Sequence, residues 1–309
     1  MIRSRHITYV VLLALLLSAS LHLQARQLPG VPITLSPVTF APGDLIVSLE
    51  TGPVLWLTVD GILRRVLAQT SPGTGEGMAL DAARNLYVTR WCIDPFCGAA
   101  ADGGSVEKYN NLGLPLGKVA ATFDCSPHTI LFDAAGATYV GQAGCNKSIL
   151  KFAPGQAVPT EHAVQQDNQG VFWMDLAGDG CTMFYTSFGP NVKRYNMCTM
   201  SQLPDFNAAS VPGGMAQDLR VLPDGGVLVS SGQVVARLNN AGVLTQTYEV
   251  PGEATLWSGL DFADNGTAFW VGNYFTSNLY KFNLATGATL ASISIGTPSN
   301  SVVGVRVVR

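Results

Sequence analysis

The sequence has 309 residues, a formal net charge of −3 and only 13% charged residues. It has no cluster of basic residues beyond its first few positions, so nucleic acid or an anionic membrane surface has no electrostatic support as a partner. The length allows one large domain or two ordinary ones, and the internal organisation of the chain decides between them.

The first 25 residues have the pattern of a secretory signal peptide. Two arginines and a histidine precede an apolar run at residues 10–17, and small and polar residues follow. The apolar run is much shorter than the ~20 residues that a membrane-spanning helix needs. We therefore expect residues 1–25 to be cleaved. The mature protein is then exported, either periplasmic or secreted, and has no stable membrane span.

A basic residue within a short apolar and aromatic run recurs at intervals of 43 or 44 residues. A period in the forties that is built from short strands is typical of a toroidal β-propeller. We expect the basic side chains to pair with neighbours or to lie along the outer surface rather than to form a site. The five copies are Lys108, Lys151, Arg194, Arg237 and Lys281.

Each copy predicts one four-stranded antiparallel blade. Two apolar strands, a and b, flank a turn, as in residues 77–88 and 129–140, then strand c carries the basic residue and strand d follows. Later turns contain Asp-Gly or Asn-Gly, which favour hairpins because both residues tolerate a positive φ. Five complete blades begin near Glu76, Pro127, Val171, Met215 and Trp257.

A sixth blade is divided between the two ends of the chain. Residues 41–47, 54–57 and 62–67 resemble strands b, c and d, and residues 304–308 have the pattern of the missing strand a. Pairing the two ends in one blade closes the ring and protects its edges. We therefore predict that residues 26–309 form a single all-β domain. It is a six-bladed β-propeller whose C-terminal strand completes the N-terminal blade.

The first complete repeat is longer than the others, and its additional residues fall between Arg90 and Gly104. A long loop on a regular scaffold is a usual place for function. An ornament that a disulfide ties down is equally common, so both interpretations of this loop remain open.

Six cysteines lie beyond residue 25, and an even number in an exported chain predicts disulfides. One pair lies across a b–c hairpin, in a register that places Tyr185 opposite Arg194. A zinc site of reduced cysteines is the competing interpretation, which the spacings and the export disfavour. The predicted disulfides are Cys92–Cys97, Cys125–Cys145 and Cys181–Cys198.

Propeller ligands usually bind where the central channel opens on the face formed by the d–a and b–c loops. Aromatic and polar residues are expected there, and such a mouth suits an oxygen-rich or sugar-like ligand, because rings supply area and polar groups supply direction. The alternative is that these are ordinary loop and packing residues. The candidates are Glu76, Trp91, His128, Trp173, Asp218, Trp257 and Asn273.

Four adjacent inner strands carry charged residues one level deeper in the channel. Asp175, Arg220, Asp261 and Arg306 alternate in sign. Neighbouring inner strands crowd together at the axis, so we predict a chain of ion pairs that lines part of the channel. A buried charge is tolerated only when it is paired, which makes this role structural. The alternative is that Arg220 or Arg306 binds an anionic ligand from the channel floor.

Residues 77–88 and 129–140 resemble NHL repeats, and the turns at 223–225 and 179–180 look like those of the regucalcin and gluconolactonase family. That family holds a divalent metal at the channel mouth with a Glu, two Asn and an Asp. The metal polarises a lactone carbonyl and activates water. Streptogramin lyases are also NHL-like propellers, but they use clustered His and Glu near a metal, and the histidines of this chain form no such cluster.

The resemblance implies a divalent cation such as calcium as cofactor. Glu76 matches the family's first ligand, and Asp218 approximates its acidic ligand. The family's Asn positions are replaced here by residues near Trp173 or Ser258. The resemblance is therefore specific for the fold and leaves the metal site incomplete.

Two functions remain open. The first is a secreted NHL-like propeller that acts as a binding scaffold for a small molecule or a protein, as a monomer, through the channel mouth and the 90–104 loop. The second is a metal-dependent hydrolase such as a lactonase, or a lyase, with a non-standard site around Glu76, His128 and Asp218.

Overall fold

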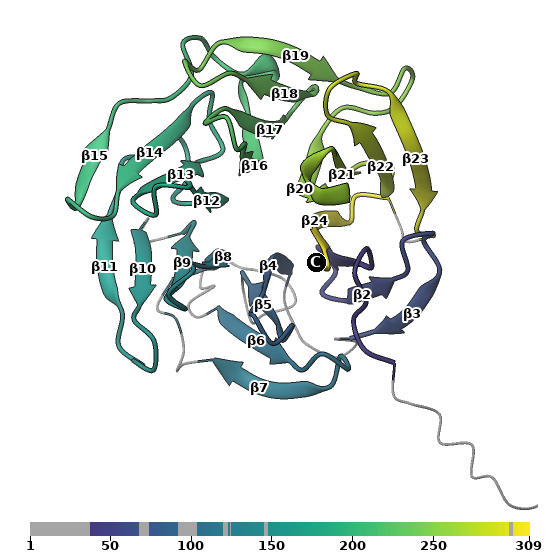
Figure 1. The fold of residues 1–309 in the computed structure, drawn as a ribbon, viewed down its shortest axis with the longest axis horizontal. Coiled ribbons are helices and arrows are strands. Elements are labelled where there is room, and N and C mark those ends of the chain that lie inside the picture. Colours follow the sequence, from purple (N-terminus) through teal and green to yellow (C-terminus); the bar gives the residue numbers. More distant parts are fainter. Residues whose placement is uncertain are drawn as a thin grey trace, which may run out of the picture. The chain divides into compact units, whose positions relative to one another are not determined.

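The computed structural model describes residues 38–67, 74–91, 104–119, 123, 125–144, 148–296 and 299–309. Residues Val38–Arg309 form one compact unit, in which six four-stranded sheets stand around a central axis (Figure 1). The predicted six-bladed β-propeller is confirmed. The predicted signal peptide lies outside the described residues, and no helix within them is long and apolar enough to cross a membrane.

Each blade is an antiparallel meander of four strands. Blade 1 consists of β24 (Val302–Val307), β1 (Leu45–Leu49), β2 (Val54–Leu57) and β3 (Leu63–Val66). Blade 2 consists of β4 (Gly75–Leu80), β5 (Leu86–Arg90), β6 (Ser105–Tyr109) and β7 (Pro115–Val119). Blade 3 consists of β8 (Pro127–Phe132), β9 (Thr138–Gln142), β10 (Ser148–Phe152) and β11 (Thr160–Ala163).

The other three blades continue in chain order, and short 3-10 helices flank two of their inner strands. Blade 4 consists of β12 (Met174–Leu176), β13 (Thr182–Thr186), β14 (Val192–Asn196) and β15 (Ser201–Leu203). Blade 5 consists of η1 (Pro212–Gly214), β16 (Ala216–Val221), β17 (Val227–Ser231), β18 (Val235–Leu238) and β19 (Leu244–Tyr248). Blade 6 consists of β20 (Trp257–Ala263), η2 (Asp264–Gly266), β21 (Ala268–Asn273), β22 (Asn278–Asn283) and β23 (Thr289–Ser294).

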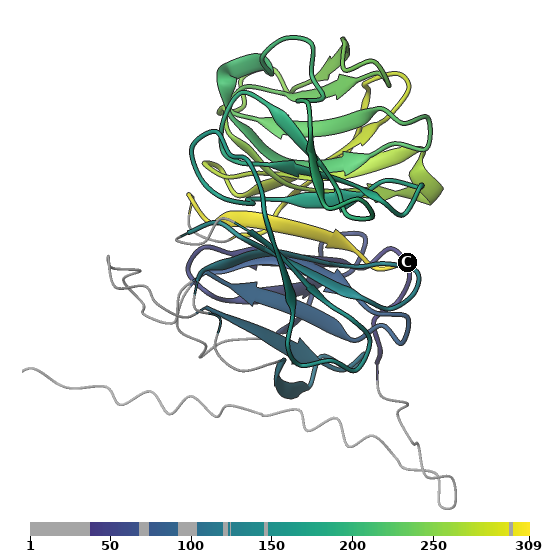
Figure 2. The ribbon, with the colours of Figure 1, turned by 90° about the vertical axis from the view of Figure 1, so that its left-hand side faces the viewer.

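β24 closes the ring. It pairs antiparallel with β1, so that Val305 lies opposite Val47 and Val307 lies opposite Leu45. Figure 2 shows this yellow strand alongside the dark blue strands at the start of the described chain. The C-terminal strand therefore completes the N-terminal blade, as the pattern of residues 304–308 predicted, and β1 has a hydrogen-bonded neighbour on each side.

The described core consists of six apolar clusters, one at each junction of two neighbouring blades. Successive side chains of a strand enter the two clusters on its two faces. In β1, Ile46 packs with Met78 of blade 2, whereas Leu45 and Val47 pack with Trp270 of blade 6. Inner strands are buried on both faces, and this explains why the sequence shows them as continuous apolar runs.

The recurring basic residue occupies a structural position on strand c. In blades 2, 3 and 6 it lies opposite an aromatic residue of strand b and close to the face of that ring. The Nζ atom of Lys108 is 4.9 Å from the ring centroid of Tyr87, a cation–π distance. Lys281 also forms an ion pair with the turn residue Asp264 at 2.6 Å. These contacts agree with the expectation that the basic residues pair with their neighbours.

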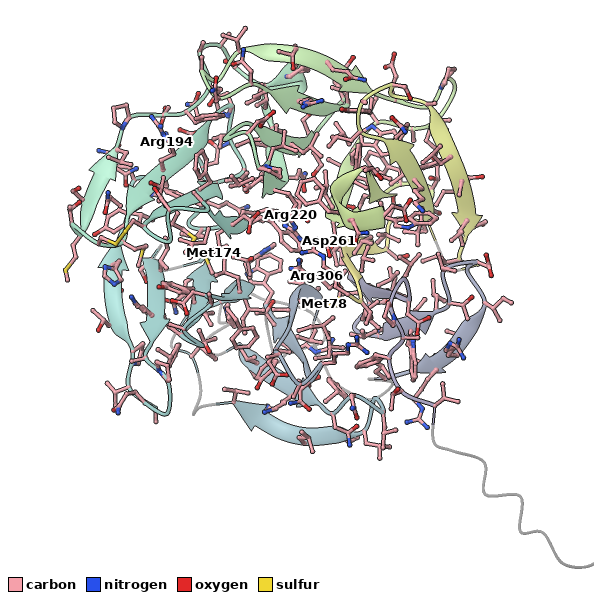
Figure 3. All side chains as sticks on the ribbon, viewed as in Figure 1. Met78, Met174, Arg194, Arg220, Asp261 and Arg306 are labelled. Atoms are coloured by element: carbon pink, nitrogen blue, oxygen red, sulfur yellow. A yellow bond between two sulfur atoms is a disulfide. The ribbon has the colours of Figure 1, made fainter. Side chains whose placement is uncertain are left out.

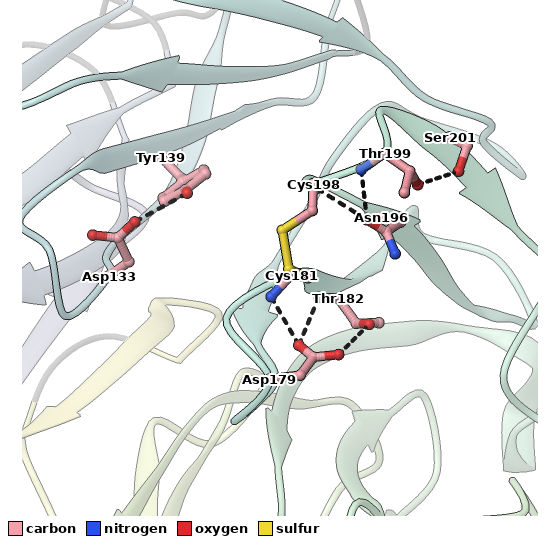
Figure 4. The surroundings of a disulfide bond; sticks show 9 residues. All are labelled: Asp133, Tyr139, Asp179, Cys181, Thr182, Asn196, Cys198, Thr199 and Ser201. Carbon is pink, nitrogen blue, oxygen red and sulfur yellow. Dashed lines mark hydrogen bonds between the residues drawn. A yellow bond between two sulfur atoms is a disulfide. The ribbon is translucent and has the colours of Figure 1, made fainter.

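The predicted Cys181–Cys198 disulfide is present between the ends of β13 and β14 (Figure 4). The two Cα atoms are 5.3 Å apart, within the range that a disulfide bridges. Asp179 accepts hydrogen bonds from the backbone N–H groups of Cys181 and Thr182, which holds the preceding turn in place. The bond joins two strands of one blade, so it stabilises a hairpin and not a junction between blades.

The predicted register of this hairpin is wrong by one residue. Tyr185 lies opposite Lys193, and Arg194 lies opposite Phe184. The ladder is symmetric about Gly189, because Phe188 adopts a positive φ of 56° and tightens the turn. The cysteines are therefore not directly opposite one another. Cys198 lies one residue beyond the position opposite Cys181.

The remaining cysteines are only partly covered by the described residues. Cys125 is disulfide-bonded. Its predicted partner Cys145 lies outside the described residues, and so do Cys92 and Cys97. The pairs 92–97 and 125–145 therefore stay predictions.

Candidate functional site

The central channel has two distinct ends, because all inner strands run in the same direction along it. We call the end where the inner strands begin the upper mouth, and it is the predicted ligand-binding face. We call the end where they finish the base, and it is surrounded by the turns between strands a and b. Candidate residues lie at both ends.

Four of the seven predicted mouth residues come together at the upper mouth. Nε2 of His128 is 3.4 Å from Oε2 of Glu76, and both side chains are buried, at 2% and 5% exposed. The imidazole ring lies 5.9 Å from the ring of Trp173 and 6.4 Å from that of Trp91. Phe172, which the sequence did not single out, lies closest to it, at 3.8 Å between ring centroids.

Burial keeps Glu76 and His128 uncharged at neutral pH. It raises the pKa of Glu76 to about 8, because the ionised carboxylate is costly away from water. It lowers the pKa of His128 to about 3 for the same reason. Within the described part of the chain, Nδ1 of His128 is buried without a hydrogen-bond partner. The two residues form a neutral acid–imidazole pair and not an ion pair.

Trp173 crosses the channel instead of lining its rim. It is only 3% exposed, and a Cβ atom placed on Gly304 of β24 would lie 3.3 Å from its Cη2 atom. Blade 4 carries Trp173 and blade 1 carries Gly304, and these blades lie opposite each other in the ring (Figure 1). The indole therefore reaches across the channel from blade 4 to β24 of blade 1.

Trp257 and Asn273 both make contacts that stabilise the fold. Trp257 is buried between blades 5 and 6, and its Nε1–H donates to the carbonyl of Gln233 at 3.0 Å. The side-chain amide of Asn273 donates to the carbonyl of Ala254 at 2.5 Å and fixes a loop. Neither residue contacts Glu76 or His128 in the described structure, so these two mouth candidates lie apart from the cluster.

A network of buried charges lies deeper in the channel. Arg220 contacts Asp261 at 3.2 Å and Asp218 at 2.8 Å, and Asp261 also contacts Arg306 at 3.4 Å. Figure 3 shows Arg220, Asp261 and Arg306 together at the centre of the ring. Arg309 adds a further contact to Asp261 at 2.9 Å. Of the predicted chain of ion pairs, the part formed by Arg220, Asp261 and Arg306 is thus present.

Asp218 occupies the place in this network that the sequence assigned to Asp175. The carboxylate of Asp175 accepts backbone N–H groups from Leu176 and Val221, at 3.1 and 2.9 Å. Asp218 contacts Arg220, two positions further along the same strand. Residues two apart on a strand share a face, so the spacing of Asp218 and Arg220 was a signal for their pairing.

The pKa shifts show where the charges of this network are compensated. Burial raises the pKa of Asp218 to about 6 and also raises that of Asp175. Burial also acts to raise the pKa of Asp261, but the charges of three arginines lower it overall. Burial and the neighbouring Arg220 lower the pKa of Arg306 to about 10, although Asp261 and Asp218 act to raise it.

The base of the channel opens into a cavity of about 460 Å³. Charged residues of blades 1, 2, 4 and 6 line it together with an apolar wall. The sequence missed Arg84 and Arg309 as candidates, because Arg84 lies in a turn and Arg309 follows the last strand. The charged residues that line the cavity are Asp81, Arg84, Asp175, Asp261, Arg306 and Arg309.

The residues present do not fit the divalent-cation site that the family resemblance implies. Glu76 belongs to the neutral pair with His128, whereas Asp218 is bound to Arg220 and to the backbone N–H groups of Leu219 and Leu260. Among the described residues, no three His, Cys, Asp or Glu side chains meet at the spacing of a metal site. The two proposed ligands thus lie in separate clusters.

Solved structures with this fold belong to proteins of different function. A virginiamycin B lyase from Staphylococcus aureus superposes with a TM-score of 0.55 and 12% identity, over 74% of this chain and 72% of that one. A gluconolactonase from Xanthomonas campestris gives 0.58 and 16%, over 73% and 78%. A chain of a nidogen/laminin complex gives 0.67 and 12%, over 85% and 97%.

This chain shares the β-propeller fold of these proteins, and at 12–16% identity the likeness shows the fold alone. The sequence itself matches no protein-family model and no curated protein. The solved neighbours of this propeller fold range from lyase and lactonase to a chain of a protein–protein complex. The fold therefore does not select a function, and the site has to carry that argument.

Proposed function

We propose that the chain is an exported binding propeller that takes a small molecule at the base of its channel. The observation that supports this is the cavity of about 460 Å³ on the propeller axis, a size that suits small-molecule ligands. It combines charged groups with the apolar side chains of Leu131 and Phe132. Export is supported by the apolar run at residues 10–17 and by the Cys181–Cys198 disulfide.

The proposed ligand site lies at the base of the channel, whereas the sequence predicted one at the upper mouth, at the opposite end. Near the upper mouth the buried indole of Trp173 reaches across the channel to Gly304. The insertion between Arg90 and Gly104 remains a proposed contact surface for a protein partner. Arg90 at its start is buried and forms an ion pair with Glu107 at 3.0 Å, which anchors one end of that insertion to blade 2.

Calorimetric titration tests the binding function with three probes that share one apolar body, namely 4-phenylbutyrate, 4-phenylbutanol and 4-phenylbutylamine. We expect at least one of them to bind, and we expect Ala82→Trp to weaken that binding at least tenfold. Ala82 is exposed and lines the cavity, so a large side chain there covers it without disturbing the core. The matched control is Ala134→Trp, at the equivalent exposed turn of blade 3.

A metal-dependent hydrolase remains the alternative function, and a second titration tests it. Calcium, manganese and zinc are each titrated into the protein without the signal peptide. Binding that Glu76→Gln abolishes would favour the enzyme. Failure of all three phenyl probes to bind, or binding that Ala82→Trp leaves unchanged, would remove the support for a ligand at the base.

A further inference from the structure

We propose that the ligand at the base is a small organic anion, in which a carboxylate or similar oxyanion group is joined to an apolar body. Arg306 and Arg309 of blade 1 and Arg84 of blade 2 would hold the anionic group. This inference rests on the proposed binding function and names the chemistry of its ligand.

The arginines of blade 1 share a single acidic partner. Asp261, which is fully buried, receives contacts from Arg220, Arg306 and Arg309 on the same oxygen, Oδ1. Asp218 balances Arg220. The carboxylates of Asp81, Asp175 and Asp261 line the same cavity as Arg84, Arg306 and Arg309. What favours an anion is therefore the set of guanidinium N–H donors that these carboxylates leave unused.

These arginines also have unused hydrogen-bond donors. Arg306 gives Nε and Nη2 to the carbonyl of Met78, and its Nη1 lies 3.4 Å from Asp261. Arg309 gives only Nη2 to Asp261, so among the described residues its Nε and Nη1 have no hydrogen-bond acceptor. A guanidinium presents five N–H donors in a planar fork that matches a carboxylate or phosphate.

Arg84 supplies a third cationic group from a different blade. It follows β4 in the turn before β5, and its guanidinium makes no hydrogen bond or ion pair among the described residues. The nearby Asp81 makes no ion pair with Arg84: its carboxylate lies 4.0 Å from Nζ of Lys108 and accepts the backbone N–H groups of Ala83 and Asn85. Arg84 is therefore available to the cavity that it lines.

The apolar wall of the cavity indicates the rest of the ligand. Leu80, Leu131, Phe132 and Val307 lie on inner strands of three blades and line the same space as the arginines. A bare inorganic ion would leave this wall in contact with water, whereas an apolar body would cover it and gain roughly 25 cal/mol for each Å² removed from water. The observations therefore favour an organic anion over free phosphate.

Asp175 lies on the opposite wall of the cavity and acts against anion binding when it is ionised. Its oxygens accept the backbone N–H groups of Leu176 and Val221, and no ion pair joins it to Arg84, Arg306 or Arg309. Asp175→Asn keeps an acceptor and removes the negative charge. We expect this substitution to tighten binding of an anion several-fold and to leave binding of a neutral analogue unchanged.

Calorimetry on the full protein with the same three phenyl probes tests the charge preference. We expect 4-phenylbutyrate to bind, and the alcohol and the amine to bind at least tenfold more weakly. Arg309→Gln and Arg84→Gln should each weaken the anion at least fivefold, because a charge-assisted hydrogen bond is lost. The fold should tolerate Arg309→Gln, since that side chain is 65% exposed.

Arg194→Gln is the matched control, because it removes the same charge from strand c of blade 4, away from the channel (Figure 3). Unchanged affinity in this variant supports a local effect. If the alcohol or amine binds as tightly as the acid and Ala82→Trp blocks it, the binding function stands and the anion inference is wrong. If inorganic phosphate binds as tightly as 4-phenylbutyrate, the apolar part of the inference is wrong.

Discussion

At the scale of single residues, Gly304 explains how the indole of Trp173 can reach across the channel to blade 1. A Cβ atom on Gly304 would lie 2.5 Å from Oγ of Ser48 and 2.7 Å from the carbonyl oxygen of Glu76. Glycine therefore lets β24 approach blade 2 closely while the indole of Trp173 reaches it from the other side. The neighbours of Gly304 are thus Ser48 of blade 1, Glu76 of blade 2 and the indole of Trp173, which comes from blade 4 across the axis.

We predict that Gly304→Ala lowers the free energy of unfolding by about 1–3 kcal/mol, because the added methyl group overpacks a rigid junction. Urea unfolding measures the change. The control is Gly178→Ala, since a Cβ atom at that exposed position would have no atom within 4 Å. It should change stability by about 0.5 kcal/mol or less. Equal stability of both variants would show that β24 can shift away from the indole.

The neutral Glu76–His128 pair is the other notable feature at this scale. The pKa of Glu76 rises from 4.5 to about 8 on folding, so its full contribution to stability is present below pH 4.5 and is lost as the pH rises to about 8. The pKa of His128 falls from 6.5 to about 3, so its contribution is present above pH 6.5 and is lost as the pH falls. Raising the pH therefore removes the stabilising contribution of Glu76 and restores that of His128.

Glu76→Gln isolates the carboxyl part of this balance. The amide cannot ionise, so we predict that the stability of the variant relative to the wild type increases by roughly 3 kcal/mol between pH 5 and pH 8. Urea unfolding at the two pH values measures this difference. Glu249→Gln, at an exposed position on the outer surface, serves as the control and should show no such trend. A constant difference between Glu76→Gln and the wild type would contradict the raised pKa.

At the scale of elements, the sequence predicted whole strands well and side-chain partners less well. The spacing of basic residues located the blades, because each strand-c lysine or arginine contacts groups of its own blade, as Lys108 does with Tyr87. The hairpin register was one residue out, because the positive φ of Phe188 is not a property that its residue type predicts. The pairing of Asp218 with Arg220 was missed, although their spacing of two residues on one strand was a signal for it.

The cavity at the base was not predictable from sequence patterns. It depends on side chains from turns and strand ends of several blades, and Arg84 and Arg309 belong to no repeated motif. The upper mouth was predicted from residue type at the correct strand ends, and Glu76 and His128 do meet there. That Trp173 reaches across the channel depends on the missing side chain at Gly304, on the opposite blade.

The Cys181–Cys198 disulfide gives a prediction at this scale. It closes a loop of 17 residues within blade 4, so the chain-entropy model gives a loss of about 3 kcal/mol when it is absent. We expect the Cys181→Ser/Cys198→Ser variant to lose about 2–4 kcal/mol in urea unfolding. Dithiothreitol should destabilise the wild type more than the variant, because the variant no longer has this bond to reduce. A variant as stable as the wild type would show that the turn bonds of Asp179 suffice.

At the scale of the whole molecule, the ring depends on one pairing between distant parts of the chain. β24 provides the inner strand of blade 1 and carries Arg306, so ring closure and the charge network are assembled by the same strand. An unpaired β1 would present a free strand edge, which is a template for self-association. Closure therefore protects both the edge and the candidate binding site.

We predict that a chain ending at Asn300, which lacks β24, loses cooperative unfolding and self-associates. Circular dichroism with urea and size-exclusion chromatography measure the two effects. A synthetic peptide of residues 299–309, added in excess, should restore a cooperative transition by pairing with β1. A monomeric truncated chain with the unfolding curve of the full protein would contradict the role assigned to β24.

The pairing of β24 with β1 also sets the order in which the chain can mature during its synthesis. β1 leaves the ribosome early, and its partner follows about 250 residues later. Until then the first blade lacks its inner strand, and the guanidinium of Arg306 is absent from the channel. The proposed binding site can thus form only after β24 has been synthesised.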